Sequence, residues 1–416
     1  MASPSASRPY PALFVAAHVL LACYGGYKMR VESALNDVPV GFQDVVANAR
    51  FPNGLPLKTR YLGVPYLDDT LPWLVASFVA GPAGWDTSVR LQQMYFLYNF
   101  AGILAVLVVE SRRRANASRI TTWIALWAIF YQTVGGNFVV PMWFAVDLAT
   151  SNDDSGLFAS AAASTRREVP LPYAQFLLPA TILGYLLPTA LLYVPWGWSH
   201  EVNQLVTALW QPAPLLVSLF LVLLSGAARS LSVTTNTRTA AHAGGFPNGR
   251  DSPPKENVPA GDITPPDDVL FLKTYYFMVG MLCFVVHVYV LYQIQIDGYL
   301  ATVTGGHVTF GSVFIPSKRV WKDSIHTGLH YLFQWDAIGI FGACWTWSCV
   351  KAWDILRVTR PRTSVVPTVA LITLGNIILG PGAALMAVWW WRENKLVQLA
   401  VRAESQGSQQ EVKKVR

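Results

Sequence analysis

The sequence predicts an all-α integral membrane protein, a polytopic bundle of about eight transmembrane helices. Of its 416 residues, 53% are hydrophobic and 13% are charged, whereas soluble domains carry about 25% charged residues. Several apolar runs reach the roughly 20 residues that a helix needs to cross a bilayer. Because these runs occur from one end of the chain to the other, we expect residues 1–416 to form a single membrane domain.

Eight apolar runs are predicted to cross the membrane as helices. In chain order they are Pro11–Tyr27, Arg90–Val109, Ile120–Val146, Leu171–Val194, Leu205–Ser225, Val269–Ile296, Leu329–Val350 and Ser364–Trp391. Pro141 is expected to bend the third of them. A shorter run, Leu71–Gly84, is interrupted by proline and glycine and is predicted to be re-entrant or interfacial. Residues 226–268 are expected to form a flexible polar loop, and residues 396–416 a disordered tail.

The basic residues give an orientation that conflicts with this count. Ser111–Arg119 contains four arginines and no acid, so the positive-inside rule places it in the cytoplasm, together with both termini. Lys351–Arg362 is also basic, yet alternation of eight spans places it on the other side. Either part of residues 297–328 re-enters, or Leu71–Gly84 and one other run are miscounted. We expect a multi-pass protein of the endoplasmic reticulum that binds no nucleic acid, because no basic patch carries interleaved aromatic residues.

Several cofactor motifs are missing from the sequence. The acid pairs Asp68-Asp69, Asp153-Asp154 and Asp267-Asp268 lack the further acid that a magnesium-binding DDxxD cluster needs. His326 and His330 form a single HxxxH, for which two histidines facing water are the simpler interpretation. The four cysteines form no CxxC pair, and no P-loop or GxGxxG motif is present. We therefore expect no metal, no other cofactor and no disulfide.

The main candidate for a functional residue is Asp336, which lies roughly 10 Å inside the predicted helix Leu329–Val350. An ionised carboxylate there costs several kcal/mol, so the group is paired or protonated. On a helix, Phe333, Ile340 and Trp347 share the face of Asp336. One interpretation is a protonated acid that meets an apolar substrate. The alternative is a hydrogen bond to a neighbouring helix that only holds the bundle together.

Other residues could support proton chemistry in an apolar cavity. Asp147 and His287 are candidates to accept a proton or to hold the acid in place, although His287 could equally be structural. Aromatic faces stabilise cations, and Trp143, Trp335, Trp347 and Phe333 are candidate cavity walls. Asn137 is a candidate substrate contact, but a bridge between helices is the preferred interpretation. This set suits acid-triggered cation chemistry on a lipophilic molecule, and it also suits a proton-coupled carrier.

Two segments resemble a known family. GGNFVVPMWFAVDLATS (Gly135–Ser151) and FPNGLPLKTRYLGVPYLDDTLPW (Phe51–Trp73) are similar to fungal membrane-bound terpene cyclases of meroterpenoid biosynthesis, of the ascochlorin and ascofuranone pathway type. The similarity extends over most of the chain, from about residue 10 to 395. It implies a metal-independent membrane enzyme of the isomerase or lyase class, which protonates a terminal epoxide or olefin of a farnesylated aromatic and cyclises the carbocation.

The resemblance also implies the partners, namely a lipophilic prenylated aromatic substrate and membrane lipid, with no obligate protein partner. Asp336 is then expected to be the general acid, an assignment that rests on the physical argument above. Two alternatives from other classes remain. One is a transporter that exports a lipophilic secondary metabolite, and the other is a sterol-isomerase-like membrane protein with the same acid and aromatic residues.

Overall fold

The computed structural model describes residues 7–151, 166–194, 196–242, 266–304, 308–359 and 364–415. Within these ranges the regular structure is helical, and the only β geometry is an isolated bridge between Arg50 and Pro56. The predicted all-α class is therefore confirmed. In the part of the chain that the structure describes, four helices are long and apolar enough to cross a membrane, namely Pro11–Leu35, Thr87–Arg112, Ala213–Ser230 and Asp267–Asp297.

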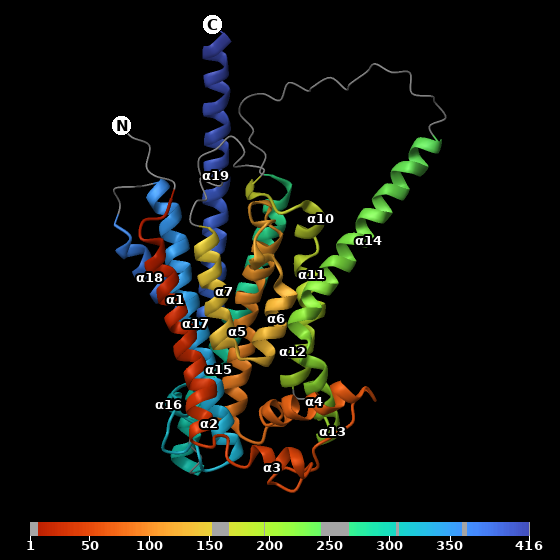
Figure 1. Ribbon diagram of the computed structural model, residues 1–416, viewed down its shortest axis with the longest axis vertical. Helices are drawn as coiled ribbons and strands as arrows, with labels where there is room; N and C mark the ends of the chain where they lie inside the picture. Colours follow the sequence, from red (N-terminus) through yellow and green to blue (C-terminus); the bar gives the residue numbers. More distant parts are fainter. Residues whose placement is uncertain are drawn as a thin grey trace.

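The long helices form a bundle along the long axis of Figure 1. Helix α5 (Thr87–Arg112) lies at its centre, with nearly every residue buried, and it packs against α15 (Asp267–Thr304), α17 (Ile325–Thr359) and α19 (Pro381–Val415). Helix α1 (Pro11–Gly26) packs against α7 (Gly136–Thr150). Both chain termini lie at one end of the bundle. We call it the arginine end, because it holds the buried Arg8, Arg113, Arg167 and Arg392.

The third predicted span is a hairpin. Helix α6 (Ile124–Thr133) runs inward from the arginine end, and α7 returns to that end. The base of the hairpin is closed by Trp143, whose Nε1 donates a hydrogen bond to the carbonyl of Thr121. The chain reverses at Gly135, whose φ of 125° is open to glycine and strained for other residues. The prediction of one helix over Ile120–Val146, bent at Pro141, is therefore wrong, since Pro141 lies inside α7.

The last predicted span, Ser364–Trp391, is a second hairpin. Helix α18 (Val366–Ile378) runs inward along α17, and α19 returns along α5. The turn is at Gly380, which has a φ of 85° and is followed by a proline at the first position of α19. The N–H of Gly382 donates to the side chain of Asn99 on α5 at 3.0 Å, which fixes the tip inside the bundle.

The first of these hairpins removes the conflict over charge, and the second keeps the end of the chain on the same side. Each one returns the chain to the end from which it entered, so each adds no crossing. Ser111–Arg119 and the basic segment after Lys351 consequently lie at the same end of the bundle. Neither of the explanations expected from the sequence, a re-entrant part of 297–328 or a miscounted Leu71–Gly84, is needed.

Two other predicted spans are also divided. Residues Leu171–Val194 form α10 (Leu171–Ala174), α11 (Leu177–Thr181), a π-helical turn (Ile182–Leu186) and α12 (Leu187–Tyr193). Residues Leu205–Ser225 are shared between α13 (His200–Trp210) and α14 (Ala213–His242), which are separated at Pro212. Proline removes a backbone donor and clashes with the preceding turn, which accounts for the second break.

The end opposite the arginine end is closed by short elements, α2 (Ser33–Leu35), α3 (Phe42–Ala47), α4 (Pro65–Phe78), α13 and α16 (Phe310–Phe314). Helix α4 contains the first part of the run Leu71–Gly84, which was predicted to be re-entrant or interfacial. Asp68 in its first turn accepts hydrogen bonds from the N–H groups of Tyr61, Leu62 and Gly63. These donors lower the pKa of the Asp68 carboxyl.

Two helices extend into the predicted loop and the predicted tail. Helix α14 continues through His242, and α19 through Val415. Part of the predicted loop 226–268, residues 243–265, lies outside the described residues. At the start of the tail, Leu396 and Leu399 pack against Ile355 of α17.

Candidate active site

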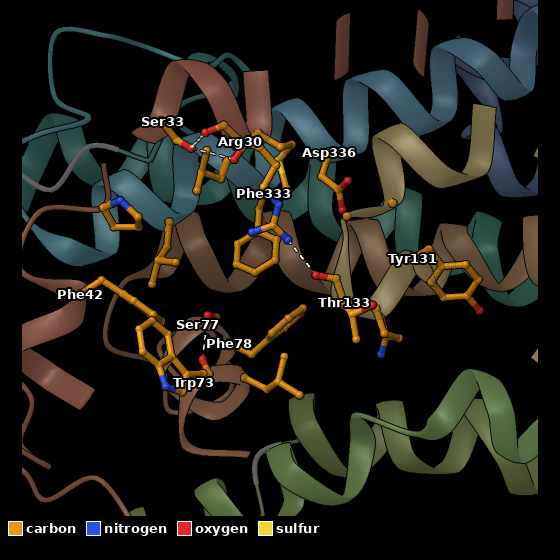
Figure 2. Close-up of a pocket in the computed structure, with 18 of the residues that line it drawn as sticks. Arg30, Ser33, Phe42, Trp73, Ser77, Phe78, Tyr131, Thr133, Phe333 and Asp336 are labelled. Atoms are coloured by element: carbon orange, nitrogen blue, oxygen red, sulfur yellow. Dashed lines mark hydrogen bonds between the residues drawn. The ribbon is translucent and has the colours of Figure 1, made fainter. Parts of the chain in front are cut away.

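A cavity of about 850 Å³ opens between α17, α5, the tip of the α6–α7 hairpin and α4. Its volume is in the range of sites that take drug-sized ligands. Aromatic side chains from several helices form much of its wall, namely Phe42, Trp73, Phe78, Phe96, Phe100, Tyr131, Tyr185, Trp210 and Phe333. Figure 2 shows Asp336 beside this wall, with Phe333 and Phe78 facing the same space.

Asp336 is buried, with 8% of its surface exposed, and it contributes to the cavity lining. Its Oδ1 accepts a hydrogen bond from the backbone N–H of Asn137 at 2.7 Å. The carboxyl therefore caps the N-terminus of α7, where unpaired N–H groups carry partial positive charge. Gly136 permits this approach, because a Cβ at that position would lie 3.2 and 3.3 Å from the two carboxyl oxygens.

Arg30 caps the other half of the same hairpin. Its Nε donates to the carbonyl of Val134 at 2.9 Å and its Nη2 to that of Thr133 at 2.8 Å. These carbonyls end α6 and carry partial negative charge. Arg30 also contributes to the cavity lining. The sequence analysis missed this residue, because it follows the first apolar run and reads as the start of a polar loop.

Both interpretations of Asp336 have support in this geometry. The contact with α7 is structural, while the position on an aromatic cavity wall is what a proton donor to an apolar substrate requires. A protonated carboxyl can do both, since its carbonyl oxygen accepts the bond from Asn137 and its hydroxyl oxygen carries the proton.

The family follows from comparison with known proteins. Residues 17–397 match the model of the CtvD domain. The chain belongs to the CtvD-domain family. Among similar curated proteins are terpene cyclase ctvD of Aspergillus terreus, 25% identical over 48% of this chain and 59% of that protein, and terpene cyclase ascI of Acremonium egyptiacum, 25% identical over 38% and 40%.

A third relative, terpene cyclase DEP1 of Alternaria brassicicola, is 26% identical over 48% of this chain and 52% of that protein. The chain thus spans about half the length of the curated relatives that it matches. No solved structure matches the chain. The family resemblance found in the sequence is confirmed.

In this CtvD-domain protein, the remaining predicted residues lie elsewhere in the bundle. Asp147 is buried and pairs with Lys351 at 2.7 Å, and it accepts a bond from Trp347 Nε1 at 2.8 Å. Trp347 stacks on Phe144, and Trp143 packs edge-on against Trp347. These residues form a layer between the cavity and the arginine end. Their predicted catalytic and substrate-binding roles stay predictions.

His287, Trp335 and Asn137 are also absent from the cavity lining. His287 Nδ1 lies 3.1 Å from the hydroxyl of Tyr95. Trp335 packs edge-on against Tyr24 of α1, and Lys28 Nζ, in the π-helical turn after α1, lies 4.9 Å from its ring centroid. Asn137 donates its side-chain amide to the carbonyl of Trp335 at 3.1 Å, as expected for a bridge between helices. Of the eight predicted residues, Asp336 and Phe333 line the cavity, and Asn137 contacts Asp336.

Acidic residues at the arginine end are held by cations. Glu110 pairs with Arg113 and Arg392, and Glu393 pairs with Arg113 and Arg167.

His330 contacts the carbonyl of Ser312 at 2.8 Å. In the described part of the chain, no three His, Cys, Asp or Glu side chains converge as metal ligands.

Proposed function

We propose that this protein is a membrane-bound terpene cyclase in which Asp336 is the general acid. Its substrate is a farnesylated aromatic compound with a terminal epoxide or olefin. Membership of a family with curated terpene cyclases supports the reaction class. The observation that carries the choice of acid is the place of Asp336, buried at the wall of an aromatic cavity large enough for such a molecule.

In the proposed reaction, the hydroxyl oxygen of Asp336 gives its proton to the epoxide oxygen or to the olefin carbon. The C–O bond or the π bond breaks, and a tertiary carbocation forms. An internal alkene then attacks this cation and closes the ring. A proton finally leaves a carbon atom next to the last cation and is taken up by the Asp336 carboxylate formed in the first step, which restores the acid, so substrate and product have equal mass.

The reaction also requires a carbocation that is stabilised and kept away from water, and the cavity walls are suited to this. A carbocation in contact with water is trapped as an alcohol, whereas aromatic faces stabilise positive charge through their quadrupole. Phe78, Phe333 and Phe100 come from α4, α17 and α5, so they surround the cavity from three sides. Phe78 and Phe333 also pack against each other, with ring centroids 4.7 Å apart.

A carrier is the second candidate, because discontinuous helices whose ends point into the bundle are common at transporter binding sites. The α6–α7 and α18–α19 hairpins have this form. Both enter from the arginine end, however, whereas many transporter folds place such elements in inverted repeats. The two functions differ in their product, since a cyclase converts its substrate to an isomer and a carrier only moves it.

The test is to incubate membranes that contain the protein with a farnesylated phenol epoxide and to measure an isomer of equal mass. Asp336→Asn keeps an oxygen that can accept the bond from Asn137 and loses the proton. Turnover per folded molecule should fall by about 10²–10⁴-fold, the usual contribution of general acid catalysis. Asp336→Glu keeps a carboxyl group and should retain part of the activity. Near-normal turnover of Asp336→Asn would remove Asp336 from the mechanism.

A further inference from the structure

Two arginines at the arginine end lie beside the ring of Tyr173. This tyrosine belongs to the short helix α10, which packs against α14 and α15. The guanidinium carbon of Arg112, in the last turn of α5, is 4.9 Å from the centroid of the Tyr173 ring. The guanidinium carbon of Arg229, on α14, is 4.7 Å from the same centroid. The ring attracts each cation, so two like charges that repel each other are held at one place.

Neither Arg112 nor Arg229 pairs with a carboxylate in the described part of the chain. The sequence of α14 contains no acidic residue at all. Other arginines of this region each pair with an acid, namely Arg113 with Glu110, Arg114 with Glu168 and Arg167 with Asp268. The acids close to Tyr173 are therefore already engaged, and two positive charges are left over.

The ring of Tyr173 also leaves the hydrogen-bonding capacity of both arginines unused. A guanidinium group carries five N–H donors in its own plane, whereas an aromatic ring contacts the face of that plane. Arg112 is partly exposed and Arg229 is exposed, so a ligand at the surface can reach them. A phosphate group matches this arrangement, because it combines negative charge with several acceptor oxygens.

The level of the two arginines along the bundle is that of a membrane surface. Arg112 ends the candidate membrane span of α5, and Arg229 is one residue from the end of the candidate span of α14. The polar headgroups of a bilayer begin where the apolar part of a span ends. The preceding turns of α14 present three exposed apolar side chains, namely Leu219, Val222 and Leu223. A ligand with its phosphate at the arginines would therefore have an apolar surface directly below it.

We propose that Arg112 and Arg229 form a binding site for the headgroup of an anionic phospholipid, whose acyl chains lie along α14. Oxygen atoms of the headgroup accept hydrogen bonds from the two guanidinium groups, and its negative charge offsets their repulsion. A membrane lipid is favoured over a soluble anion by the level of the site and by the apolar side chains below it. The bound lipid links the end of α5 to α14. This inference does not depend on the proposed cyclase function.

The test is native mass spectrometry of the full-length protein in detergent, titrated with phosphatidylserine or with phosphatidylcholine of the same acyl chains. The unchanged protein should bind phosphatidylserine more tightly. A basic residue near a membrane surface contributes about fivefold to the binding of anionic lipid. Arg229→Gln, which alters only an exposed side chain, should therefore lower the preference about fivefold, and Arg112→Gln/Arg229→Gln about tenfold to thirtyfold. The ratio of the two affinities is compared on monodisperse protein, so a general loss of stability does not imitate the effect.

Arg166→Gln/Lys395→Gln is the matched control, because it removes two positive charges at the same end from residues that do not contact Tyr173. This variant should keep the preference for phosphatidylserine. An equal loss in both double variants would show that only the total charge matters and would overturn the inference. So would equal affinity of the unchanged protein for the two lipids. Displacement of phosphatidylserine by millimolar inorganic phosphate at constant ionic strength would assign the site to a soluble anion instead of a lipid.

Discussion

The Oδ1 atom of Asp336 accepts a hydrogen bond from the backbone N–H of Asn137 at 2.7 Å, which joins the middle of α17 to the first turn of α7. This contact orients the carboxyl. With one oxygen held by α7, the other is the position from which a proton can leave. The hairpin thus orients the proposed acid. Any change that separates α7 from α17 should lower turnover more than it lowers the amount of folded protein.

The first prediction concerns Gly136. In Gly136→Ala, the new Cβ would lie 2.5 Å from Ile340 Cδ1 and 3.2 Å from Asp336 Oδ1. The methyl group of Ile340 can rotate away, but the carboxyl must shift by a few tenths of an ångström. We expect turnover to fall at least about tenfold, the effect of a small misplacement of a catalytic group. Folded protein, measured by size-exclusion chromatography in detergent, should decrease less.

Gly342→Ala provides the matched control on α17. No atom lies within 4 Å of a Cβ at Gly342, and alanine is favoured over glycine inside a helix by about 1 kcal/mol. This variant should be as active as the unchanged protein and slightly more stable. Equal activity of Gly136→Ala and Gly342→Ala would show that the position of the carboxyl at α7 is unimportant.

The sequence was sufficient for the class of fold and for finding Asp336 as a buried carboxyl group, and the physical reason is the same for both. Low charge and long apolar runs predict a bundle of helices that can cross a membrane, and a carboxylate inside such a run is costly enough to be noticed. The hairpins could not be found in this way. Ile120–Val146 has the length and composition of one spanning helix, and the turn at Gly135 depends on residues far away in the chain. Arg30 is 104 positions from Val134, and Asp336 is 199 positions from Asn137.

The cavity was also hidden from the sequence. Its walls at Phe78, Phe100 and Tyr131 belong to three helices, none of which shows a distinctive aromatic periodicity. Trp143 and Trp347 were predicted as walls because they share a helical face with Asp147 or Asp336. In the structure they pack against each other and fill the layer toward the arginine end. Tryptophan in an apolar run is as suitable for helix packing as for a ligand wall.

The second prediction concerns orientation. Ser118 precedes α6 and Ser364 precedes α18, and both helices begin at the arginine end, whereas Thr59 precedes α4 at the opposite end; all three residues are exposed. In sealed microsomes with the cytoplasmic face outward, cysteines at Ser118 and Ser364 should react with a membrane-impermeant maleimide. A cysteine at Thr59 should react only after permeabilisation. The unsubstituted protein gives the background from its own four cysteines.

The comparison between Ser118 and Ser364 tests the α6–α7 hairpin, which lies between them in the chain. Eight continuous spans place the two positions on opposite faces of the membrane, whereas this hairpin places them on the same face. Labelling from opposite faces would contradict the α6–α7 hairpin, and labelling of both only after permeabilisation would reverse the orientation.

The third prediction separates structure from chemistry at Asp147. This carboxylate is 4% exposed and pairs with Lys351, which is 5% exposed and also donates to Ser151 at 2.9 Å. Asp147→Asn leaves a buried cation without its partner, and such a loss costs about 3–5 kcal/mol. We expect the amount of folded protein to fall sharply. In Asp147→Asn/Lys351→Met no charge is left unpaired, and a buried ion pair replaced by uncharged groups is often neutral. The double variant should therefore restore folding.

Turnover per folded molecule then shows what Asp147 does. If the residue only holds α7 to α17, the double variant cyclises at close to the normal rate, because the cavity and Asp336 are unchanged. If Asp147 accepts the final proton, as the sequence analysis allowed, the double variant folds but remains slow by about 10²-fold or more. The geometry favours the first result, because both Asp147 contacts, the Lys351 pair and the bond from Trp347, lie in the packed layer and not on the cavity wall. A folded but slow double variant would bring Asp147 back as the proton acceptor.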